Sequence, residues 1–452
     1  MKTALRITCL AVALGAALLC SRAPVQAATP ATVAATPPMG WNSWDCYGTT
    51  VTEAEVKANA DYMAAHLKQH GWQYVVVDIQ WSQPAAQGFD YQPDANLAMD
   101  SYGRLIPAVN RFPSSADGKG FKPLADYVHG LRLKFGIHIM RGIPRRAVKA
   151  NLPVFGSKAH AADFADVYSL CPWNPDMYGV DTSKSGGQDY YDSIVKLYAG
   201  WGVDFIKADD ISRPTHGGEI VALHKAILKT GRSIVLSLSP GPAMVKDKEL
   251  LQANANMWRI SDDFWDDWKA LRLNFILLSI WSGVGRPGAW PDPDMLPLGR
   301  IGGRPEQGHA RRTNFTPAEQ QTLLSLWAIA QAPLIFGGDL PGNDEATLKL
   351  ITNDEVLAVD QKGAHGGAFA EGGDDIVWTA DAVGSNAKYV AVFNVGDSKP
   401  AQIRVDWPAL KLPKKCTLRD LWAHKDLGTI EGGYAFSVEP HASGLYKLTP
   451  AP

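Results

Sequence analysis

Two acidic segments, each at the end of a predicted β-strand, carry the residues best suited to do chemistry. The first reads FIKADD at residues 205–210, and the second reads WRISDD at residues 258–263. An apolar strand that ends in carboxylates is typical of a parallel barrel, whose strands open onto one functional face. One carboxylate from each of two such strands can supply a nucleophile and a general acid, the pair that cleaves a glycosidic bond.

Asp209 is the candidate nucleophile, because it ends its strand two residues after Lys207. A lysine that close would keep the carboxylate ionised, as a nucleophile must be. The competing interpretation is a capping carboxylate at the junction of a strand and a helix. For an isolated pair such as Asp209 and Asp210, this structural role is the commoner one.

Asp263 is the candidate general acid, four residues after Arg259. Its aromatic neighbours in the sequence are Trp258, Phe264, Trp265 and Trp268. Apolar surroundings favour the neutral form of a carboxyl group, which a general acid needs. In the competing interpretation, all four nearby aspartates only cap helices or lie on a solvent-exposed face: Asp262, Asp263, Asp266 and Asp267.

Further acidic residues follow other predicted strands. Asp78 ends one of them and could accept hydrogen bonds from sugar hydroxyls. WPDPDM at residues 290–295 looks like a rigid loop at another strand end. Asp292 and Asp294 could hold a metal ion, but no histidine cluster supports this, so we expect neither a metal nor a cofactor. GVGRPG at residues 283–288 matches G-x-G-x-x-G without joining a first strand to a helix, so we reject a dinucleotide site.

The composition is that of a globular protein with a large core. The chain has 452 residues, 46% of them hydrophobic and 20% charged, and the length suggests about two or three domains. A formal charge of −2 and the lack of a basic run give no reason to expect a nucleic-acid partner. The 15 tryptophans fit a sugar-binding protein, although core packing is the commoner role for any one of them.

The first 27 residues read as a secretory signal. Lys2 and Arg6 precede an apolar stretch over about residues 7–19, and VQA at residues 25–27 offers a cleavage site. We therefore expect an exported protein, periplasmic or secreted, with no membrane-spanning segment. After cleavage, at most one disulfide could form among the remaining cysteines, whose spacing suits no zinc site: Cys46, Cys171 and Cys416.

The rest of the chain divides into a linker, a barrel and a β-domain. Residues 28–37 are a small-residue linker, with order expected from Met39. Residues 38–360 repeat a helix-then-strand unit, which implies a parallel sheet, and the number of units favours a closed (β/α)8 TIM barrel. Residues 361–452 hold short strands split by turns and predict an antiparallel β-sandwich. Barrel strands are predicted at residues 74–78, 135–140, 203–208, 233–238, 257–261 and 333–336.

Several motifs, taken together, resemble glycoside hydrolase family 27. MGWNSW at residues 39–44 is similar to the opening of that family, which comprises retaining α-galactosidases, α-N-acetylgalactosaminidases and some β-L-arabinopyranosidases. The similarity covers about residues 36–450 and implies a (β/α)8 barrel followed by an antiparallel β-domain, as the residues themselves predict. Later motifs match in order: WQYVVVD at 72–78, WGVDFIKAD at 201–209, WRISDD at 258–263 and DPDML at 292–296.

The resemblance also implies a role for each matched residue. Asp209 would be the nucleophile, and Asp263 would be the acid and base. Trp44 would form a wall of the sugar site, and Met295 would pack against the sugar. The hydroxyl-binding residues would be Asp78, Lys207 and Arg259.

The chain departs from the family pattern at three strand ends. Ile79 follows Asp78 where galactosidases have a second aspartate, SPG at residues 239–241 replaces Cys-x-Trp, and IMRG at residues 139–142 replaces a Tyr-Ser-Asp type of sequence. The missing carboxylate would bind the C6 hydroxyl of galactose, and its absence would cost about 1–3 kcal/mol. β-L-arabinopyranose has the same ring stereochemistry without the hydroxymethyl group, so an apolar wall suits it better.

These features predict an exo-acting, retaining glycosidase that acts on oligosaccharides or polysaccharides. It would release terminal α-D-galactosyl or β-L-arabinopyranosyl residues. Three alternatives stay open: an isomalto-oligosaccharide-releasing enzyme, an α-N-acetylgalactosaminidase, and a sugar-binding barrel without catalytic activity. The second is less favoured, because the small-residue pocket that this activity needs cannot be identified in the sequence.

Overall fold

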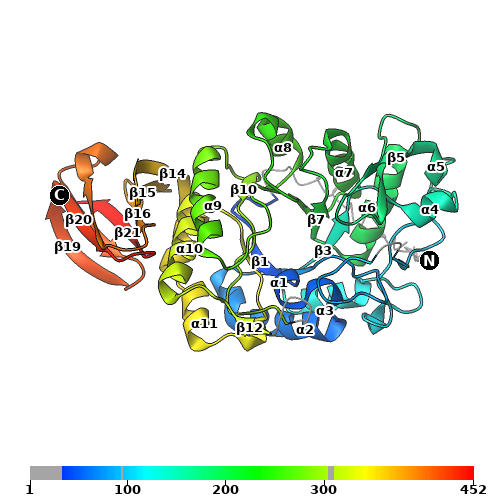
Figure 1. Ribbon diagram of the computed structural model, residues 1–452, viewed down its shortest axis with the longest axis horizontal. Coiled ribbons are helices and arrows are strands. Elements are labelled where there is room, and N and C mark those ends of the chain that lie inside the picture. Colours follow the sequence, from blue (N-terminus) through cyan, green and yellow to red (C-terminus); the bar gives the residue numbers. More distant parts are fainter. Residues whose placement is uncertain (1–32, 93–94, 304–309, 452) are drawn as a thin grey trace, which may run out of the picture.

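The computed structural model describes residues 33–92, 95–303 and 310–451, which form a barrel followed by a β-domain (Figure 1). Eight parallel strands lie in the order β10-β9-β8-β7-β3-β2-β1-β13. Leu296, just after β10, forms a parallel bridge with Phe336 of β13, and its N–H donates to Ile335 O at 2.7 Å. This contact closes the predicted barrel. The strands are β1 (Met39–Asn42), β2 (Tyr74–Val77), β3 (Lys134–Met140), β7 (Phe205–Asp209), β8 (Val235–Leu238), β9 (Met257–Arg259), β10 (Trp290–Asp292) and β13 (Leu334–Phe336).

Helices surround the barrel, and the first begins where the sequence predicts. The Thr52 hydroxyl and the Glu55 carboxylate form the expected capping box, and Gly71, at φ +95°, ends the helical segment. Only a residue without a Cβ adopts that backbone conformation at little cost. The main helices are α2 (Glu53–Tyr62), α3 (Lys122–Gly130), α6 (Gly187–Trp201), α7 (Gly217–Thr230), α8 (Lys248–Asn254), α9 (Trp268–Ile280), α10 (Pro317–Ala330), α11 (Glu345–Ile351) and α12 (Asp354–Lys362).

Ordered contacts begin earlier than the expected Met39. Val33 and Ala34 pack against the interior residues of the barrel. The carbonyl oxygen of Ala34 accepts hydrogen bonds from the Trp290 indole at 2.8 Å and from the N–H of Gly288 at 2.9 Å. Residues 33–37 therefore contact the barrel instead of forming a loose connection.

The sequence pattern does not predict β1, β10 or a small sheet that follows β3. Polar or turn-forming residues interrupt these short segments, so their apolar pattern is weak. The small sheet has the order β4-β6-β5 and brings Trp173 beside the barrel mouth. Its elements are β4 (Ile143–Pro144), α4 (Arg145–Lys149), α5 (Ala161–Phe164), β5 (Ala165–Leu170) and β6 (Met177–Val180).

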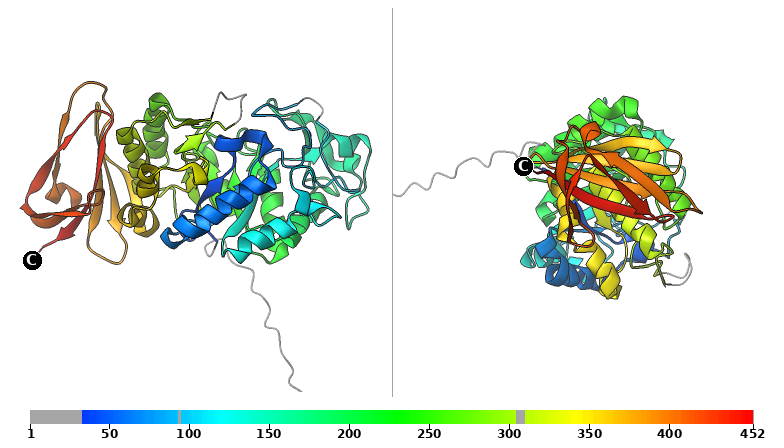
Figure 2. Two further views of the ribbon diagram at one scale, coloured as in Figure 1. Left: turned by 90° about the horizontal axis from the view of Figure 1, so that it is seen from below. Right: turned by 90° about the vertical axis from the view of Figure 1, so that its left-hand side faces the viewer.

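The C-terminal domain is the predicted antiparallel sandwich, which lies at one end of the elongated molecule (Figure 2). One sheet has the order β14-β15-β16-β21-β18-β19, and the other pairs β17 with β20. Trp407 and Phe436 are buried between the two sheets with aliphatic residues. The strands are β14 (Gly363–Gly372), β15 (Asp375–Ala382), β16 (Lys388–Asn394), β17 (Ala401–Asp406), β18 (Lys415–Asp420), β19 (Lys425–Glu431), β20 (Gly433–Val438) and β21 (Ser443–Pro450).

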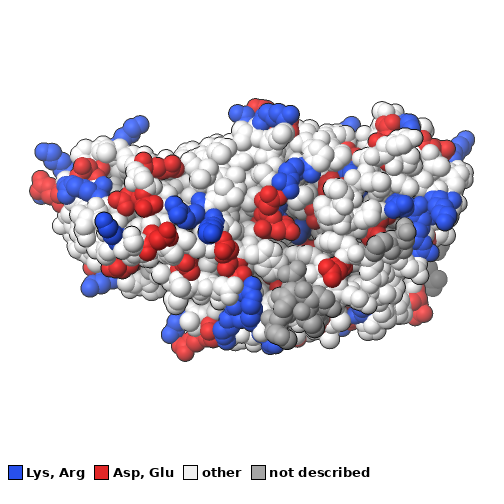
Figure 3. All heavy atoms as spheres, in the orientation of Figure 1, with Lys and Arg blue, Asp and Glu red and all other residues white. Residues whose placement is uncertain are grey.

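Neither the charged surface residues nor the cysteines that the structure describes suggest a second functional site. Basic and acidic side chains are interspersed on the face drawn in Figure 3. Cys46, Cys171 and Cys416 are all buried free thiols, so none of the disulfides that the sequence allows is present. No helix within the described ranges has the length and apolar character needed to cross a bilayer.

A two-pronged ion pair joins the barrel to the β-domain. Arg419 of β18 donates through Nε and Nη2 to the two oxygens of Glu355 in α12, each at 2.7 Å. His424 also contacts Glu355, at 2.8 Å. The hydrogen bonds from Arg419, followed by those from His424, lower the pKa of Glu355 to about 2. The free energy of unfolding therefore includes a contribution from the ionised carboxylate.

We expect Glu355→Gln to lower the free energy of unfolding by about 1 kcal/mol at pH 7, since the pair is partly exposed. The folded-state pKa is depressed, so the contribution is complete above the unfolded value and is lost as the pH falls toward 2. Urea unfolding of the parent protein and of Glu355→Gln at pH 7 and at pH 3 measures the difference in the free energy of unfolding. An equal difference at the two pH values would contradict the assignment.

Candidate active site

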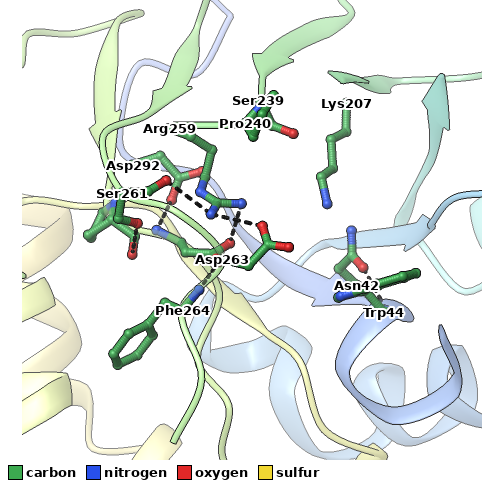
Figure 4. A network of polar contacts seen from close by, with 12 residues as sticks. Asn42, Trp44, Lys207, Ser239, Pro240, Arg259, Ser261, Asp263, Phe264 and Asp292 are labelled. Carbon is green, nitrogen blue, oxygen red and sulfur yellow. Dashed lines mark hydrogen bonds and ion pairs between the residues drawn. The ribbon is translucent and has the colours of Figure 1, made fainter. Parts of the chain in front are cut away.

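A cavity of about 420 Å³ opens at the carboxyl ends of the barrel strands. It brings together the eight residues predicted for catalysis and sugar binding, although they come from widely separated parts of the chain. Figure 4 shows Arg259 and Asp263 on one side of the site and Lys207 and Asn42 on the other. The selected residues on its wall are Trp44, Asp78, Ile79, Lys207, Asp209, Arg259, Asp263 and Met295.

Asp209 is held by donors from three different segments. Oδ1 accepts hydrogen bonds from the Ser239 hydroxyl at 2.6 Å and from the N–H of Asp210 at 2.9 Å. Oδ2 accepts a hydrogen bond from Nε2 of His138 in β3 at 3.1 Å. Burial alone would raise the pKa of Asp209, but the hydrogen bond and charge of His138, with the charge of Lys207, bring it well below its usual range. The carboxylate is therefore ionised and oriented, as a nucleophile requires.

A buried arginine fixes the backbone around Asp209. The N–H of Arg141 donates to the carbonyl oxygen of Asp209 at 2.9 Å. The Arg141 guanidinium contacts the Asp210 carboxylate at 2.7 Å and Glu219 at 2.9 Å. Asp210 is thereby kept in a left-handed conformation, φ +56°, from which its N–H reaches the side chain of Asp209. The atypical end of the third strand thus supports the candidate nucleophile.

Lys207 has a different partner from the one that the sequence suggests. Its ammonium group donates to Oδ2 of Asp78 at 2.8 Å, and the Asn42 amide donates to the same oxygen at 2.7 Å. Burial alone would raise the pKa of Asp78, but the charges of Lys207 and His138 lower it. Asp78 and Lys207 therefore form a charged pair on the pocket wall, and Lys207 acts on Asp209 only through its charge.

Asp263 does not lie in the apolar environment expected from its neighbours in the sequence. Its side chain is 62% exposed and contacts Nη2 of Arg259 at 3.2 Å. Phe264 is buried and packs near Phe315 and Trp327, away from the carboxyl group. An exposed carboxyl group at the pocket mouth is reachable by both a bound sugar and water.

The other three aspartates of this segment have structural roles. Asp262 forms an ion pair with Arg213 at the rim. Asp266 is buried and paired with Arg311. Asp267 caps α9 by accepting the N–H of Ala270 at 3.1 Å. The competing interpretation of caps and a solvated face is thus correct for Asp267, whereas Asp266 is buried in an ion pair and both Asp262 and Asp263 line the pocket.

Asp294 lines the pocket as well, and the sequence analysis considers it only as a metal ligand. Its Oδ1 is 2.9 Å from Nη1 of Arg259, and its Oδ2 accepts the N–H of Phe264 at 2.7 Å. Burial, opposed by the charge of Arg259 and reinforced by those of Asp263 and Asp292, raises the pKa of Asp294 to about 7. Arg259 is thus held between two carboxylates, and no group of three metal-ligating side chains occurs among the residues that the structure describes.

Asp45 is a second carboxyl group that the sequence analysis misses. It is buried beside the cavity, and its Oδ2 has no hydrogen-bond partner within residues 33–92, 95–303 and 310–451. Gly337 makes room for it, because a Cβ there would lie 1.8 Å from this oxygen. Burial, followed by the charge of Asp294, raises the pKa of Asp45 well above its usual value. The only hint in the sequence is its position next to Trp44.

Aromatic rings surround the mouth of the cavity. Trp44 and Tyr91 are stacked, with an interplanar angle of 7°, and Tyr91 contacts Trp173. Phe89 makes edge-to-face contacts with both Trp44 and Trp265. Such faces suit the C–H surfaces of a sugar ring.

Ile79 contributes an apolar wall. Its side chain is buried in a cluster that includes Met140 and Cys171, with Trp44 and Tyr91 against it. Met140 occupies the end of the third strand, where the family pattern has polar residues. Of this cluster, Ile79 lines the cavity and presents apolar atoms to it, while Met140 and Cys171 belong to the buried core around it.

Comparisons with known proteins show the family to which the chain belongs. The model of the family described as alpha galactosidase A matches residues 176–362, and that of the alpha galactosidase C-terminal beta sandwich domain matches residues 372–448. Alpha-galactosidase 2 of Arabidopsis thaliana is 30% identical over 425 residues, which cover 92% of this chain and 90% of the relative. The chain belongs to glycoside hydrolase family 27. It is therefore a glycosidase that hydrolyses O-glycosyl bonds.

Solved structures of family 27 resemble the chain closely. A β-L-arabinopyranosidase from Geobacillus stearothermophilus is 53% identical, with a TM-score of 0.91, over 94% of this chain and 99% of its own. A Bacillus halodurans protein provisionally described as an α-N-acetylgalactosaminidase is 47% identical, with a TM-score of 0.83, over 92% of this chain and 97% of its own. Relatives with three specificities thus share the fold, so the substrate must be argued from the pocket.

Proposed function

We propose that this family 27 enzyme is an exo-acting, retaining β-L-arabinopyranosidase, with α-D-galactosides as poorer substrates. The observation that carries the proposal is the apolar wall that Ile79 forms in the cavity, with Met140 and Cys171 packed in the same buried cluster. The 53% identity to an arabinopyranosidase supports it.

The apolar wall disfavours the hydroxymethyl group that galactose has and arabinopyranose lacks. A galactosyl unit would place its C6 hydroxyl near Ile79, where it would lose water without gaining an acceptor, at a cost of about 1–3 kcal/mol. An arabinopyranosyl unit has no group to place there. Specificity then comes from an unpaired polar group on the wrong substrate, which is an effective way to discriminate between close analogues.

The remaining pocket residues bind the sugar ring and carry out a double displacement. The hydroxyl-binding residues are Asp78, Lys207 and Arg259, while Trp44 and Met295 pack against carbon atoms of the ring. Asp209 attacks the anomeric carbon while Asp263 gives a proton to the leaving oxygen. Water, with Asp263 now acting as the base, hydrolyses the glycosyl–enzyme and regenerates Asp209. Neither step uses a metal or a cofactor.

The substrate class is tested with a panel of aryl glycosides. We expect the highest kcat/KM on the β-L-arabinopyranoside and a lower value on the α-D-galactoside. Aryl α-N-acetylgalactosaminide and isomalto-oligosaccharides test the alternative specificities, and inactivity on all of them would favour a sugar-binding barrel. Proton NMR of the first product identifies its anomer, and an inverted anomer would exclude the double displacement.

Ile79→Asp should raise the ratio of kcat/KM for the galactoside over the arabinopyranoside by roughly 10- to 100-fold. The new carboxylate would accept the hydrogen bond of the C6 hydroxyl. Ile79→Val is the matched control, because it keeps the wall apolar and should leave the ratio close to that of the parent. An unchanged or lowered ratio in the aspartate variant would contradict the role given to Ile79.

We also propose that the protein is exported and acts in the periplasm or outside the cell. The signal-like composition of residues 1–27, which lie outside the described residues, supports this. Mass spectrometry of the mature protein should find an N-terminus near residue 28. A full-length chain that stays in the cytoplasm would contradict export.

A further inference from the structure

The two oxygens of the Asp209 carboxylate accept different numbers of hydrogen bonds. Oδ1 accepts two, from the Ser239 hydroxyl and from the N–H of Asp210. Among the residues that the structure describes, Oδ2 accepts one, from Nε2 of His138. A carboxylate oxygen has two in-plane lone pairs. Both lone pairs of Oδ1 are therefore occupied, whereas Oδ2 keeps one for a further partner.

We infer that Oδ2 of Asp209 is the atom that attacks the sugar, and that His138 is a positioning residue that controls the second chemical step. The inference rests on the double displacement proposed above. It goes further by assigning the reacting oxygen and by giving each donor around Asp209 a separate task.

In the first step, the free lone pair of Oδ2 forms a bond to the anomeric carbon. The bond to the leaving oxygen breaks, and that oxygen takes the proton of Asp263. In the second step, a water oxygen bonds to the anomeric carbon and gives a proton to Asp263. The bond between carbon and Oδ2 breaks, and its electron pair returns to Oδ2. The Nε2 proton stays on His138 throughout.

The His138 hydrogen bond has opposite effects on the two steps. Before the first step Oδ2 already carries charge, which it loses as it attacks, so the hydrogen bond stabilises the reactant more than the transition state and slightly raises the barrier. In the second step charge develops on Oδ2 as the ester bond breaks, so the same donor stabilises the transition state. Removing the donor should therefore slow the hydrolysis of the glycosyl–enzyme selectively.

His138 is well placed for this task, because its ring has little freedom. The side chain is 2% exposed, and the residue lies next to Lys207 in the register of β3 with β7. Its carbonyl oxygen accepts the Trp81 indole N–H at 2.7 Å, which fixes the strand from behind. A carboxylate can only accept, so Nε2 carries the proton in this contact.

The test measures both steps by stopped flow, using an aryl β-L-arabinopyranoside with an activated leaving group. His138→Leu should reduce the rate of glycosyl–enzyme hydrolysis by roughly 10- to 100-fold, the effect of one hydrogen bond to a charged group. The initial burst of aryl alcohol should then reach one equivalent, and KM should fall because the intermediate accumulates. His138→Gln keeps a donor and should recover most of the lost rate.

Ser239→Ala is the matched control, because it removes a donor from the other oxygen. Oδ1 remains an acceptor in the glycosyl–enzyme, so this variant should affect the two steps alike. A selective defect in hydrolysis in the Ser239 variant, but not in the His138 variants, would overturn the assignment of the attacking oxygen. Equal loss in His138→Leu and His138→Gln, or equal slowing of both steps in His138→Leu, would overturn the role of His138.

Two further measurements cover a variant that does not fold and a different substrate specificity. If His138→Leu does not fold, His138→Asn takes its place, since its shorter amide cannot reach Oδ2. If the unsubstituted enzyme is active only on the α-D-galactoside, the proposed specificity fails, and the same measurements on that substrate still test His138.

Discussion

Asp209→Ala should reduce kcat/KM on an activated aryl β-L-arabinopyranoside by at least about 10⁴-fold, as expected when a covalent nucleophile is lost. The physical reason is that no other carboxylate replaces it. Asp78 is paired with Lys207, and Asp210 is paired with Arg141. Steady-state kinetics of the purified variant measure the loss, and unchanged thermal unfolding shows that the fold is retained.

Added azide separates a missing nucleophile from a damaged pocket. The small anion fits the space left by the Asp209 carboxylate and should restore turnover, giving a glycosyl azide of inverted configuration. A Ser239→Ala variant loses a neighbouring donor but keeps the nucleophile, so azide should not rescue it. Activity of Asp209→Ala that persists without azide, or a rescued product of retained configuration, would refute the role of Asp209.

The arrangement of the pocket follows from the sequence because parallel strands align their carboxyl ends. Asp78, Asp209 and Asp263 each follow an apolar run, and that pattern alone places them on one face. The runs at β2, β3 and β7 are clear enough to predict the strands within a few residues. β1 reads MGWN and β10 reads WPD, so turn-forming and polar residues interrupt the apolar run and the pattern cannot be distinguished from that of a loop.

The hydrogen bonds and ion pairs between pocket residues could not be predicted from the sequence in the same way. Lys207 is two residues from Asp209 and lies on the same side of β7, yet it donates to Asp78 of the neighbouring strand end. His138 is 71 residues from Asp209 in the sequence and contacts it directly. These contacts depend on the registers of adjacent strands and on side-chain rotamers, neither of which leaves a signal in the local sequence.

The burial of individual carboxyl groups in the pocket also differs from what the local sequence suggests. Four aromatic residues close to Asp263 in the chain predict an apolar site, but Phe264 turns into the core and leaves the carboxyl group at the pocket mouth. The converse holds for Asp45, a charged residue that the structure buries completely beside Gly337. Burial depends on where a short segment leaves its strand, which local composition does not determine.

Asp263→Ala should lower kcat/KM by about 10²- to 10⁴-fold on a disaccharide, whose leaving group needs a proton. On an activated aryl glycoside the first step needs no proton, so its rate should stay near that of the parent. Hydrolysis of the glycosyl–enzyme should still be slow, because no base activates water. The intermediate should therefore accumulate, with a burst of aryl alcohol and a lowered KM, as stopped-flow kinetics can measure.

Azide and a neighbouring aspartate make this prediction specific to Asp263. Azide needs no base, so it should speed the second step in Asp263→Ala and give a glycosyl azide of retained configuration, opposite to that from Asp209→Ala. Asp267→Ala removes a carboxylate four residues away that only caps α9. It should lose about 1 kcal/mol of stability and no activity. An equal loss of kcat/KM on both substrates in Asp263→Ala would mean that Asp263 only positions the side chain of Arg259. The proton would then have to come from another carboxyl group of the pocket. Asp294, which contacts the Arg259 guanidinium, would be the first candidate.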